Sequence, residues 1–434
     1  MQIQRIQIKN LFGMFDHDIN LKIKDRITII HGPNGIGKTT VLKLLKEIFD
    51  IRFCALQPVP FLEIIITFVN QYKLHLQKKD TGDMILTLKE GDETLIEHEM
   101  NISILNKQTG EHKIGPKDFM SHLDRVGPNK WYDKSTGDTI FETDGSHGVP
   151  IETIIKKPPK KIEKILKDFR TYFLETQRLT TSSSKDYDNH DLKTKILNNV
   201  EKYSIEMTEI LQEAIKESAS IAASLDRTFP HRLFKSELPE NANEIEIRKR
   251  YQNQSSYRQR LMKAGLLEVL EEEESVSLPD GNLESNDLKF LWYYISDMDT
   301  KLEVFSPLLK KIELFKDIIN SRLLYKSFSI EKSEGFVFLS DNGEKIPPKT
   351  LSSGEQHEIV LAYELIFKVE KKSFIMIDEP ELSLHVTWQH KLLSDLERIS
   401  KLVDLDFLIA THSPSIVHDR RSLMVALEKE SDHA

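Results

Sequence analysis

The segment GPNGIGKT, residues 32–39, constrains the fold of this chain more than any other feature. It fits the pattern G-x-x-x-x-G-K-[ST], in which glycines let backbone N–H groups turn inward around phosphate oxygens. The apolar run at 27–30 precedes it, and helical periodicity follows it in Val41, Leu44, Leu45 and Ile48. A strand, this loop and a helix in that order predict a parallel α/β sheet whose helix N-terminus faces an anion. An ordinary glycine-rich turn is the alternative, and the flanking strand and helix argue against it.

The loop supplies the first group of candidate ligand-binding residues. We expect Lys38 to reach the β- and γ-phosphates of ATP and the Thr39 hydroxyl to ligate Mg²⁺. The residues expected to bind the nucleotide here are Gly32, Pro33, Asn34, Gly35, Ile36, Gly37, Lys38, Thr39 and Thr40.

Two carboxylates follow a second apolar run, Phe374–Ile377, and these are Asp378 and Glu379. In a parallel sheet, ligands bind beyond the carboxyl ends of the strands. We expect Asp378 to hold Mg²⁺, directly or through water, and Glu379 to act as the general base that activates the attacking water. An apolar run that ends in Asp-Glu is common by itself, so this prediction depends on the loop at 32–39.

Two further motifs fit the same reaction. Ser353 and Gly354, in LSSGEQ, are expected at a helix start, where a hydroxyl and backbone N–H groups can meet a phosphate. The serine could equally serve only as a helix N-cap. His412 follows the apolar run 408–410 and is expected to contact the γ-phosphate, although a lone histidine is more often structural.

In this order, the four motifs resemble the nucleotide-binding domain of the ABC ATPase superfamily. More narrowly, IKNLFGMF, HGPNGIGKTT, LSSGEQ, IDEPELSLH and ATHSPSIV are typical of its soluble AAA15/OLD-like and RecF/SMC-like branch. Glu355 and Gln356, in the LSSGEQ motif, are also expected to bind the nucleotide. The resemblance implies that Gln177 acts as a catalytic and metal-binding Q-loop residue, and that Ser353 and Gly354 face the ATP of a second chain. It therefore implies a homo-oligomer, at least a dimer, with ATP and Mg²⁺ as cofactors.

The β and helical patterns predict an α/β, ABC-type P-loop ATPase head with a β-rich N-terminal lobe and an inserted, mostly helical region. Residues 1–180 are expected to form the N-terminal ATPase lobe, which carries an irregular insertion at 101–150. Residues 181–325 form the expected helical interaction region, and residues 326–434 form the C-terminal ATPase lobe.

Composition limits the partners and the compartment. The net charge is −9, which argues against a general nucleic-acid coat, but the lysine-rich stretch at 156–170 leaves a local DNA contact open. The alternative to a DNA contact is that the stretch forms the solvent-exposed face of a helix. A single cysteine, no secretory signal and no run near the ~20 apolar residues of a membrane span predict a cytoplasmic protein without membrane contact.

Three functional hypotheses follow from these observations. The first is the ATPase sensor or scaffold of an anti-phage defence system, such as PARIS or Septu, that controls a separate effector protein, for example a nuclease. Only a short segment follows His412, so the Toprim nuclease domain of OLD-type relatives is not expected. The second is a DNA-repair or chromosome-maintenance ATP clamp of the RecF/SMC type. The third is an ATP-bound assembly protein with slow turnover.

Overall fold

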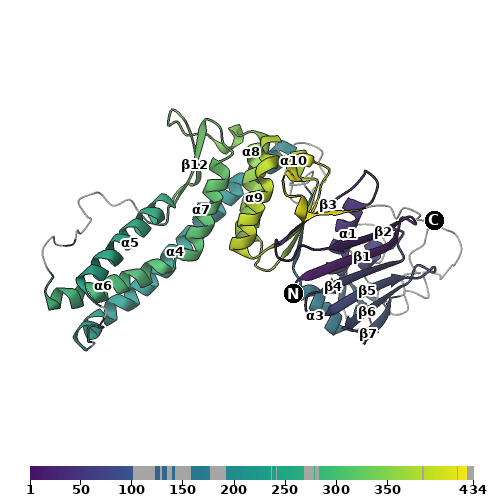
Figure 1. Ribbon diagram of the computed structural model, residues 1–434, viewed down its shortest axis with the longest axis horizontal. Coiled ribbons are helices and arrows are strands. Elements are labelled where there is room, and N and C mark those ends of the chain that lie inside the picture. Colours follow the sequence, from purple (N-terminus) through teal and green to yellow (C-terminus); the bar gives the residue numbers. More distant parts are fainter. Residues whose placement is uncertain are drawn as a thin grey trace. The chain divides into compact units, whose positions relative to one another are not determined.

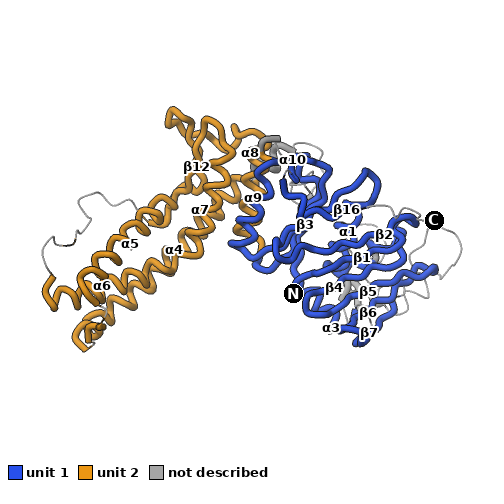
Figure 2. The backbone as a smooth tube through the Cα atoms, viewed as in Figure 1, with its two compact units in different colours: residues 1–176, 370–382, 389–434 blue, residues 177–369, 383–388 orange. Residues whose placement is uncertain are grey.

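A computed structural model describes residues 1–100, 158–175, 192–235, 237–240, 242–267, 278, 283–383, 386–417 and 419–427, and three short strands between 123 and 141. The chain divides into two compact units (Figure 2). Unit 1 comprises Met1–Thr176, Glu370–Leu382 and Gln389–Ala434, and unit 2 comprises Gln177–Val369 and Ser383–Trp388. Both units are therefore built from segments that lie far apart in the sequence.

A five-stranded parallel sheet in unit 1 carries the motif residues. Its strand order is β11 (Thr171–Glu175), β14 (Phe374–Asp378), β15 (Asp406–Ala410), β3 (Ile27–His31) and β16 (Met424–Ala426). Three of these strands are the apolar runs that precede the motifs, and Asp378 pairs in register with Ala410. The carboxyl ends of β3, β14 and β15 consequently meet at one edge, where parallel sheets bind ligands. The predicted parallel α/β sheet is confirmed.

A six-stranded antiparallel sheet forms the predicted β-rich N-terminal lobe. Its order is β2 (Phe15–Asn20), β1 (Ile3–Leu11), β4 (Glu63–Phe68), β5 (Tyr72–Lys78), β6 (Met84–Glu90) and β7 (Glu93–Met100). Buried and less buried residues alternate along β4, as expected for a sheet with one face on the core. Within the insertion expected to be irregular, β8 (Leu123–Gly127), β9 (Lys130–Asp133) and β10 (Thr139–Phe141) pair as a small sheet.

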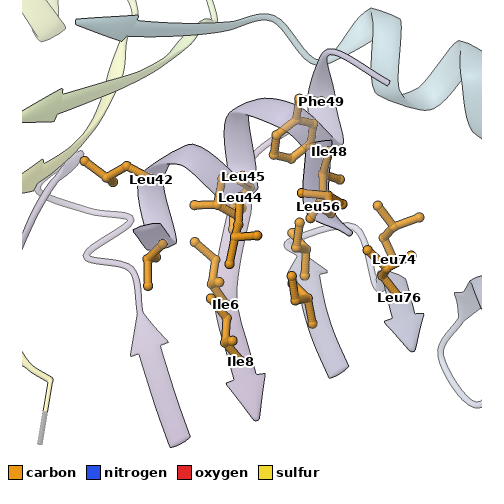
Figure 3. Close-up of a cluster of buried hydrophobic side chains, with 14 of the residues drawn as sticks. Ile6, Ile8, Leu42, Leu44, Leu45, Ile48, Phe49, Leu56, Leu74 and Leu76 are labelled. Carbon is orange, nitrogen blue, oxygen red and sulfur yellow. The ribbon is translucent and has the colours of Figure 1, made fainter. Parts of the chain in front are cut away.

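Helix α1 (Lys38–Phe49) shares one apolar core with both sheets. Ile6 and Ile8 of β1 contribute to this core (Figure 3). Phe374 of β14 and Leu408 of β15 belong to it as well. The helix buries residues on more than one face because it has apolar neighbours on several sides. The buried apolar residues of the helix are Val41, Leu42, Leu44, Leu45, Ile48 and Phe49. This packing fixes the helix that begins at the phosphate-binding loop.

The other helices of unit 1 are α3 (Lys160–Asp168), most of α9 (Val386–Val403) and α10 (Pro414–Val417). Short 3₁₀ turns lie at Phe53–Leu56, Pro380–Ser383 and Arg421–Leu423. Among the helices of the described residues, none has the length and apolar character needed to cross a membrane.

Unit 2 contains the predicted helical region and the helix that starts at LSSGEQ (Figure 1). Its helices are α4 (Leu192–Lys235), α5 (Glu244–Lys263), α6 (Ser285–Glu303), α7 (Ser306–Asn320) and α8 (Ser353–Tyr363). A 3₁₀ turn, Pro348–Thr350, precedes α8, and a π-helical turn, Glu364–Lys368, follows it. Strands β12 (Lys326–Glu331) and β13 (Gly335–Ser340) form a hairpin. Tyr203 of α4 stacks on Tyr363 of α8, with ring centroids 4.4 Å apart, and so ties the long helix to α8.

Candidate nucleotide-binding site

The loop between β3 and α1 has the backbone that its glycines predict. Gly35 and Gly37 have φ values of 84° and 98°, in the left-handed region that other residues adopt at a cost. A Cβ atom on Gly37 would lie 2.7 Å from Leu11, and one on Gly32 would lie 2.6 Å from the Leu427 carbonyl oxygen. Close neighbours thus favour glycine at positions 32 and 37, and the left-handed backbone of the turn favours it at positions 35 and 37.

Lys38 is buried at the start of α1, with 5% of its surface exposed. Its Nζ donates hydrogen bonds to the carbonyl oxygens of Gly32 at 2.9 Å and Pro33 at 3.1 Å, and lies 3.5 Å from Nδ1 of His412. Burial lowers the pKa of Lys38, while the charges of Glu379, Asp378 and Glu381 act in the opposite direction. The ammonium group is therefore held inside the loop and faces three carboxylates.

The predicted Mg²⁺ ligands lie next to each other. The Thr39 hydroxyl donates to Oδ1 of Asp378 at 3.0 Å. Within the described residues, no cluster of three or more His, Cys, Asp or Glu side chains is arranged to hold a metal. The Thr39 hydroxyl and the single carboxylate of Asp378 fit Mg²⁺, which is usually held by one or two carboxylates together with substrate phosphates and water. Thr39 and Asp378 are the residues that would hold it, and the ion would supply neutralisation of phosphate charge.

Glu379 follows β14 directly and has an unusual backbone. Its φ is 46°, a left-handed value that is uncommon for a residue other than glycine. Its N–H donates to the Ala410 carbonyl oxygen of the neighbouring strand at 2.8 Å, which holds this conformation. Strained backbone of this kind is concentrated at functional sites. The geometry therefore supports the prediction that Glu379 has a catalytic role.

Glu381 organises the segment that carries His412, and the sequence did not indicate this. Its carboxylate accepts hydrogen bonds from the Thr411 hydroxyl and from the His412 N–H, both at 2.8 Å. Gln389 extends the network, because its side chain accepts from the Ser413 hydroxyl at 2.8 Å and donates to the Glu381 backbone carbonyl at 3.2 Å. The position of His412 thus depends on a side chain from the turn after β14.

We expect the Glu381→Gln variant to hydrolyse ATP about tenfold more slowly while binding ATP with similar affinity. The glutamine amide has one acceptor oxygen where the carboxylate has two, so one of the two charge-assisted hydrogen bonds to the His412 segment is lost. Each such bond is worth about 1.5–3 kcal/mol, and the segment is therefore held less firmly. Steady-state kinetics would measure the effect. The matched control is Glu397→Gln, a glutamate of the same unit that pairs with Arg420. Equal turnover in the two variants would contradict a positioning role for Glu381.

His17 supports the phosphate-binding loop from β2. Its ring is 3% exposed, and its Nε2 donates to the Ile36 carbonyl oxygen at 2.9 Å. Burial lowers the pKa of His17 and so favours the neutral ring, while the hydrogen bond to the Ile36 carbonyl acts in the opposite direction. The two residues are 19 positions apart, and no sequence pattern links them.

The signature segment LSSGEQ begins α8 in unit 2. Ser352 is the N-cap of this helix, since its hydroxyl accepts from the Glu355 N–H at 3.2 Å and Glu355 accepts from the Ser352 N–H at 2.7 Å. Ser353 is exposed and lies in the first turn, so the cap interpretation applies to Ser352 instead. A Cβ atom on Gly354 would lie 3.1 Å from the Trp388 ring.

Two residues of this segment have structural partners. Glu355 forms an ion pair with Lys326, and Gln356 is 5% exposed and donates to the Leu351 carbonyl oxygen at 2.9 Å. Their expected contact with nucleotide stays a prediction.

The structure brings together part of the predicted site. The loop at 32–39, the start of α1 with Thr40, and the residues Asp378, Glu379 and His412 all belong to unit 1. Ser353 to Gln356 belong to unit 2. Gln177 lies outside the described residues, as do Lys156 and Lys157 of the basic stretch. The catalytic, nucleotide-binding and metal roles of all these residues stay predictions.

Two curated proteins share short segments with this chain. A spermidine/putrescine import ATP-binding protein from Protochlamydia amoebophila is 29% identical over 86 residues, which are 20% of this chain and 22% of that protein. UvrABC system protein A from Oceanobacillus iheyensis is 41% identical over 71 residues, or 16% of this chain and 7% of that protein. The matches thus span less than a quarter of either relative.

Solved structures of SMC head domains also align. One is an Smc head domain with an extended coiled coil bound to the C-terminal domain of ScpA, from Pyrococcus furiosus, with a TM-score of 0.38, 12% identity, and coverage of 99% of this chain and 94% of that chain. The SMC head domain from Thermotoga maritima gives a TM-score of 0.32 and 10% identity, with coverage of 96% and 91%. At these TM-scores the likeness supports no conclusion by itself.

The family comparison covers nearly the whole chain. The family described as AAA ATPase domain (AAA_15) matches residues 1–417. This confirms the expected AAA15-type P-loop ATPase and supports ATP hydrolysis in general, with ATP bound usually together with Mg²⁺. The chain belongs to the AAA ATPase domain family AAA_15.

Proposed function

We propose that this protein hydrolyses ATP at sites shared between two copies of itself. One copy would supply Lys38, Thr39, Asp378 and Glu379, and the other would supply Ser353 and Gly354. The observation that carries the proposal is that Ser353 is exposed at the start of α8 while Ser352 caps the helix. The Ser353 hydroxyl and the first N–H groups of the helix are therefore suited to an anion brought by another chain.

Glu379 is the proposed base. It follows Asp378 directly at the end of β14 and its charge acts on Lys38. Its carboxylate would accept a proton from the attacking water. Lys38 would stabilise charge on the phosphates, and His412, held by Glu381, would donate a hydrogen bond to the terminal phosphate. Release of that phosphate would remove contacts from both copies and weaken the dimer.

Mixing two inactive variants tests whether the site is shared. Lys38→Ala removes the phosphate-binding lysine, and Ser353→Arg blocks the signature serine, so each variant alone should lose ATP turnover. In an equal mixture, random pairing gives half mixed dimers with one intact site of two, so about a quarter of wild-type activity should return. If each site lay within one chain, no intact site would form in the mixture and no activity would return.

We further propose that the ATPase acts as a cytoplasmic sensor or scaffold in anti-phage defence and controls a separate effector such as a nuclease. The motif resemblance to the ATPase subunits of such systems supports this role. The test is phage challenge of cells that carry the gene with its neighbouring genes. Protection should disappear with Lys38→Ala, and a specific neighbouring gene product should co-purify with the ATPase. Unchanged phage sensitivity after loss of the gene would contradict the role.

A DNA-repair or chromosome-maintenance clamp is the second candidate. The observation in its favour is the lysine-rich surface of α3, where Lys160, Lys161, Lys164 and Lys167 are exposed. Lys167 pairs with Glu163, so part of this charge is already balanced within the helix. The clamp predicts DNA binding that requires ATP and weakens steeply with salt. Absence of binding at low salt would exclude it.

A further inference from the structure

The loop between α7 and β12 is fastened to the signature helix α8 at two points. Arg322 forms an ion pair with Glu358 at 3.5 Å, and the side chains of both residues are buried. Lys326 donates to both carboxylate oxygens of Glu355 at 3.0 Å. Glu355 and Glu358 are three residues apart and so lie on one face of α8. The ends of the loop therefore have fixed positions relative to this helix.

Two large apolar residues project from the loop between these fastenings. Leu323 is buried, but Leu324 and Tyr325 are 75% and 82% exposed. Tyr325 also has a φ of 59°, a left-handed value that is a genuine outlier for a bulky residue. We name Leu324 and Tyr325 the apolar tip. Scattered exposed apolar residues are ordinary, but a strained backbone that presents two adjacent ones requires a reason.

The apolar tip is continuous with the signature segment. Lys326 follows the tip and pairs with Glu355, whose carboxylate also accepts from the Ser352 N–H at 2.7 Å. Ser352 in turn precedes the exposed Ser353. Charge-assisted hydrogen bonds thus link Lys326, which adjoins the tip, to Ser352, which adjoins the residue proposed to meet another copy. A surface that contacts Ser353 through a bound nucleotide would approach the tip as well.

We propose that the apolar tip packs against a second copy of this chain when ATP joins the two. This inference rests on the proposed shared site. It adds an apolar contact between the two copies to the contacts that both make with the nucleotide. Aromatic anchors commonly supply a large part of the binding energy at such interfaces. The ion pairs would keep the tip in place beforehand, so little conformational freedom is lost on association.

The test compares dimerisation in the Glu379→Gln background, where ATP is expected to persist. The test variant adds Leu324→Ser with Tyr325→Asn, because asparagine tolerates left-handed backbone. The control adds Phe234→Ser with Ile245→Ser, two residues of unit 2 that are each 81% exposed. Sedimentation with Mg-ATP should show that the concentration for half-dimerisation rises roughly tenfold or more in the test variant and is unchanged in the control.

The outcomes separate this inference from the proposed function. If Glu379→Gln alone stays monomeric with Mg-ATP, the shared site is wrong regardless of the tip. If it dimerises and the tip variant dimerises equally well, the tip does not contact the second copy. Equal thermal midpoints of the test and control variants without nucleotide would show that both are folded. Equal ATP affinity in the monomer would show that the loss concerns association.

Discussion

Replacing Glu379 with glutamine is expected to slow ATP hydrolysis by about 10²–10⁴-fold while ATP stays bound. The amide keeps the shape of the side chain but cannot take a proton from water. The strand end and the Ala410 hydrogen bond that hold the residue at φ 46° involve only its backbone, so the substitution leaves them in place. The variant should therefore retain nucleotide binding, lose turnover and accumulate as an ATP-bound assembly.

Single-turnover kinetics with radiolabelled ATP and size measurement with Mg-ATP would check both parts of this expectation. Glu397→Gln is the control for loss of a carboxylate in the same unit, and it should behave like the wild type. Normal turnover in Glu379→Gln would show that another group is the base. Slow turnover without retained ATP would instead indicate that Glu379 contributes to binding.

The sheet at the centre of the site could be predicted because its signals are local. Each relevant strand is a short apolar run, and each ends directly in residues that carry chemistry, as in Phe374–Asp378 and Asp406–Ala410. Carboxyl ends of parallel strands share an edge, so the meeting of Thr39 with Asp378 follows from these runs together with the loop at 32–39. The antiparallel lobe could be predicted equally well, since its alternating sequence pattern has the period of a half-buried strand.

The supporting contacts could not be predicted because they join residues with no common pattern. Glu381 reaches the His412 segment 31 positions away, and Lys326 reaches Glu355 29 positions away. Which glutamate faces which partner is decided only when the strands and helices pack. The N-cap alternative considered for Ser353 applies to Ser352, because α8 begins at Ser353 and a shift of one residue at a helix start exchanges these roles.

Replacing Lys38 with alanine is expected to abolish ATP binding and hydrolysis. In the structure the ammonium group faces Asp378, Glu379 and Glu381, whose charges oppose the lowering of its pKa by burial. Without the lysine, these three carboxylates would repel a triphosphate instead of sharing a cation with it. At short distances, a change from electrostatic attraction to repulsion of the phosphates is worth several kcal/mol even with an effective dielectric constant of about 20. The affinity for ATP should therefore fall at least 100-fold.

Titration calorimetry and thermal unfolding with and without Mg-ATP would measure this loss. A ligand at about 100 times its Kd stabilises a protein by about 2.7 kcal/mol, and Lys38→Ala should lack that ATP-dependent stabilisation. Lys43→Ala is the matched control, because Lys43 lies on an exposed position of the same helix. The loop glycines and Thr39 are retained in both variants. If Lys38→Ala bound ATP as tightly as the control, the backbone of the loop alone would hold the phosphates, and the role assigned to Lys38 would be wrong.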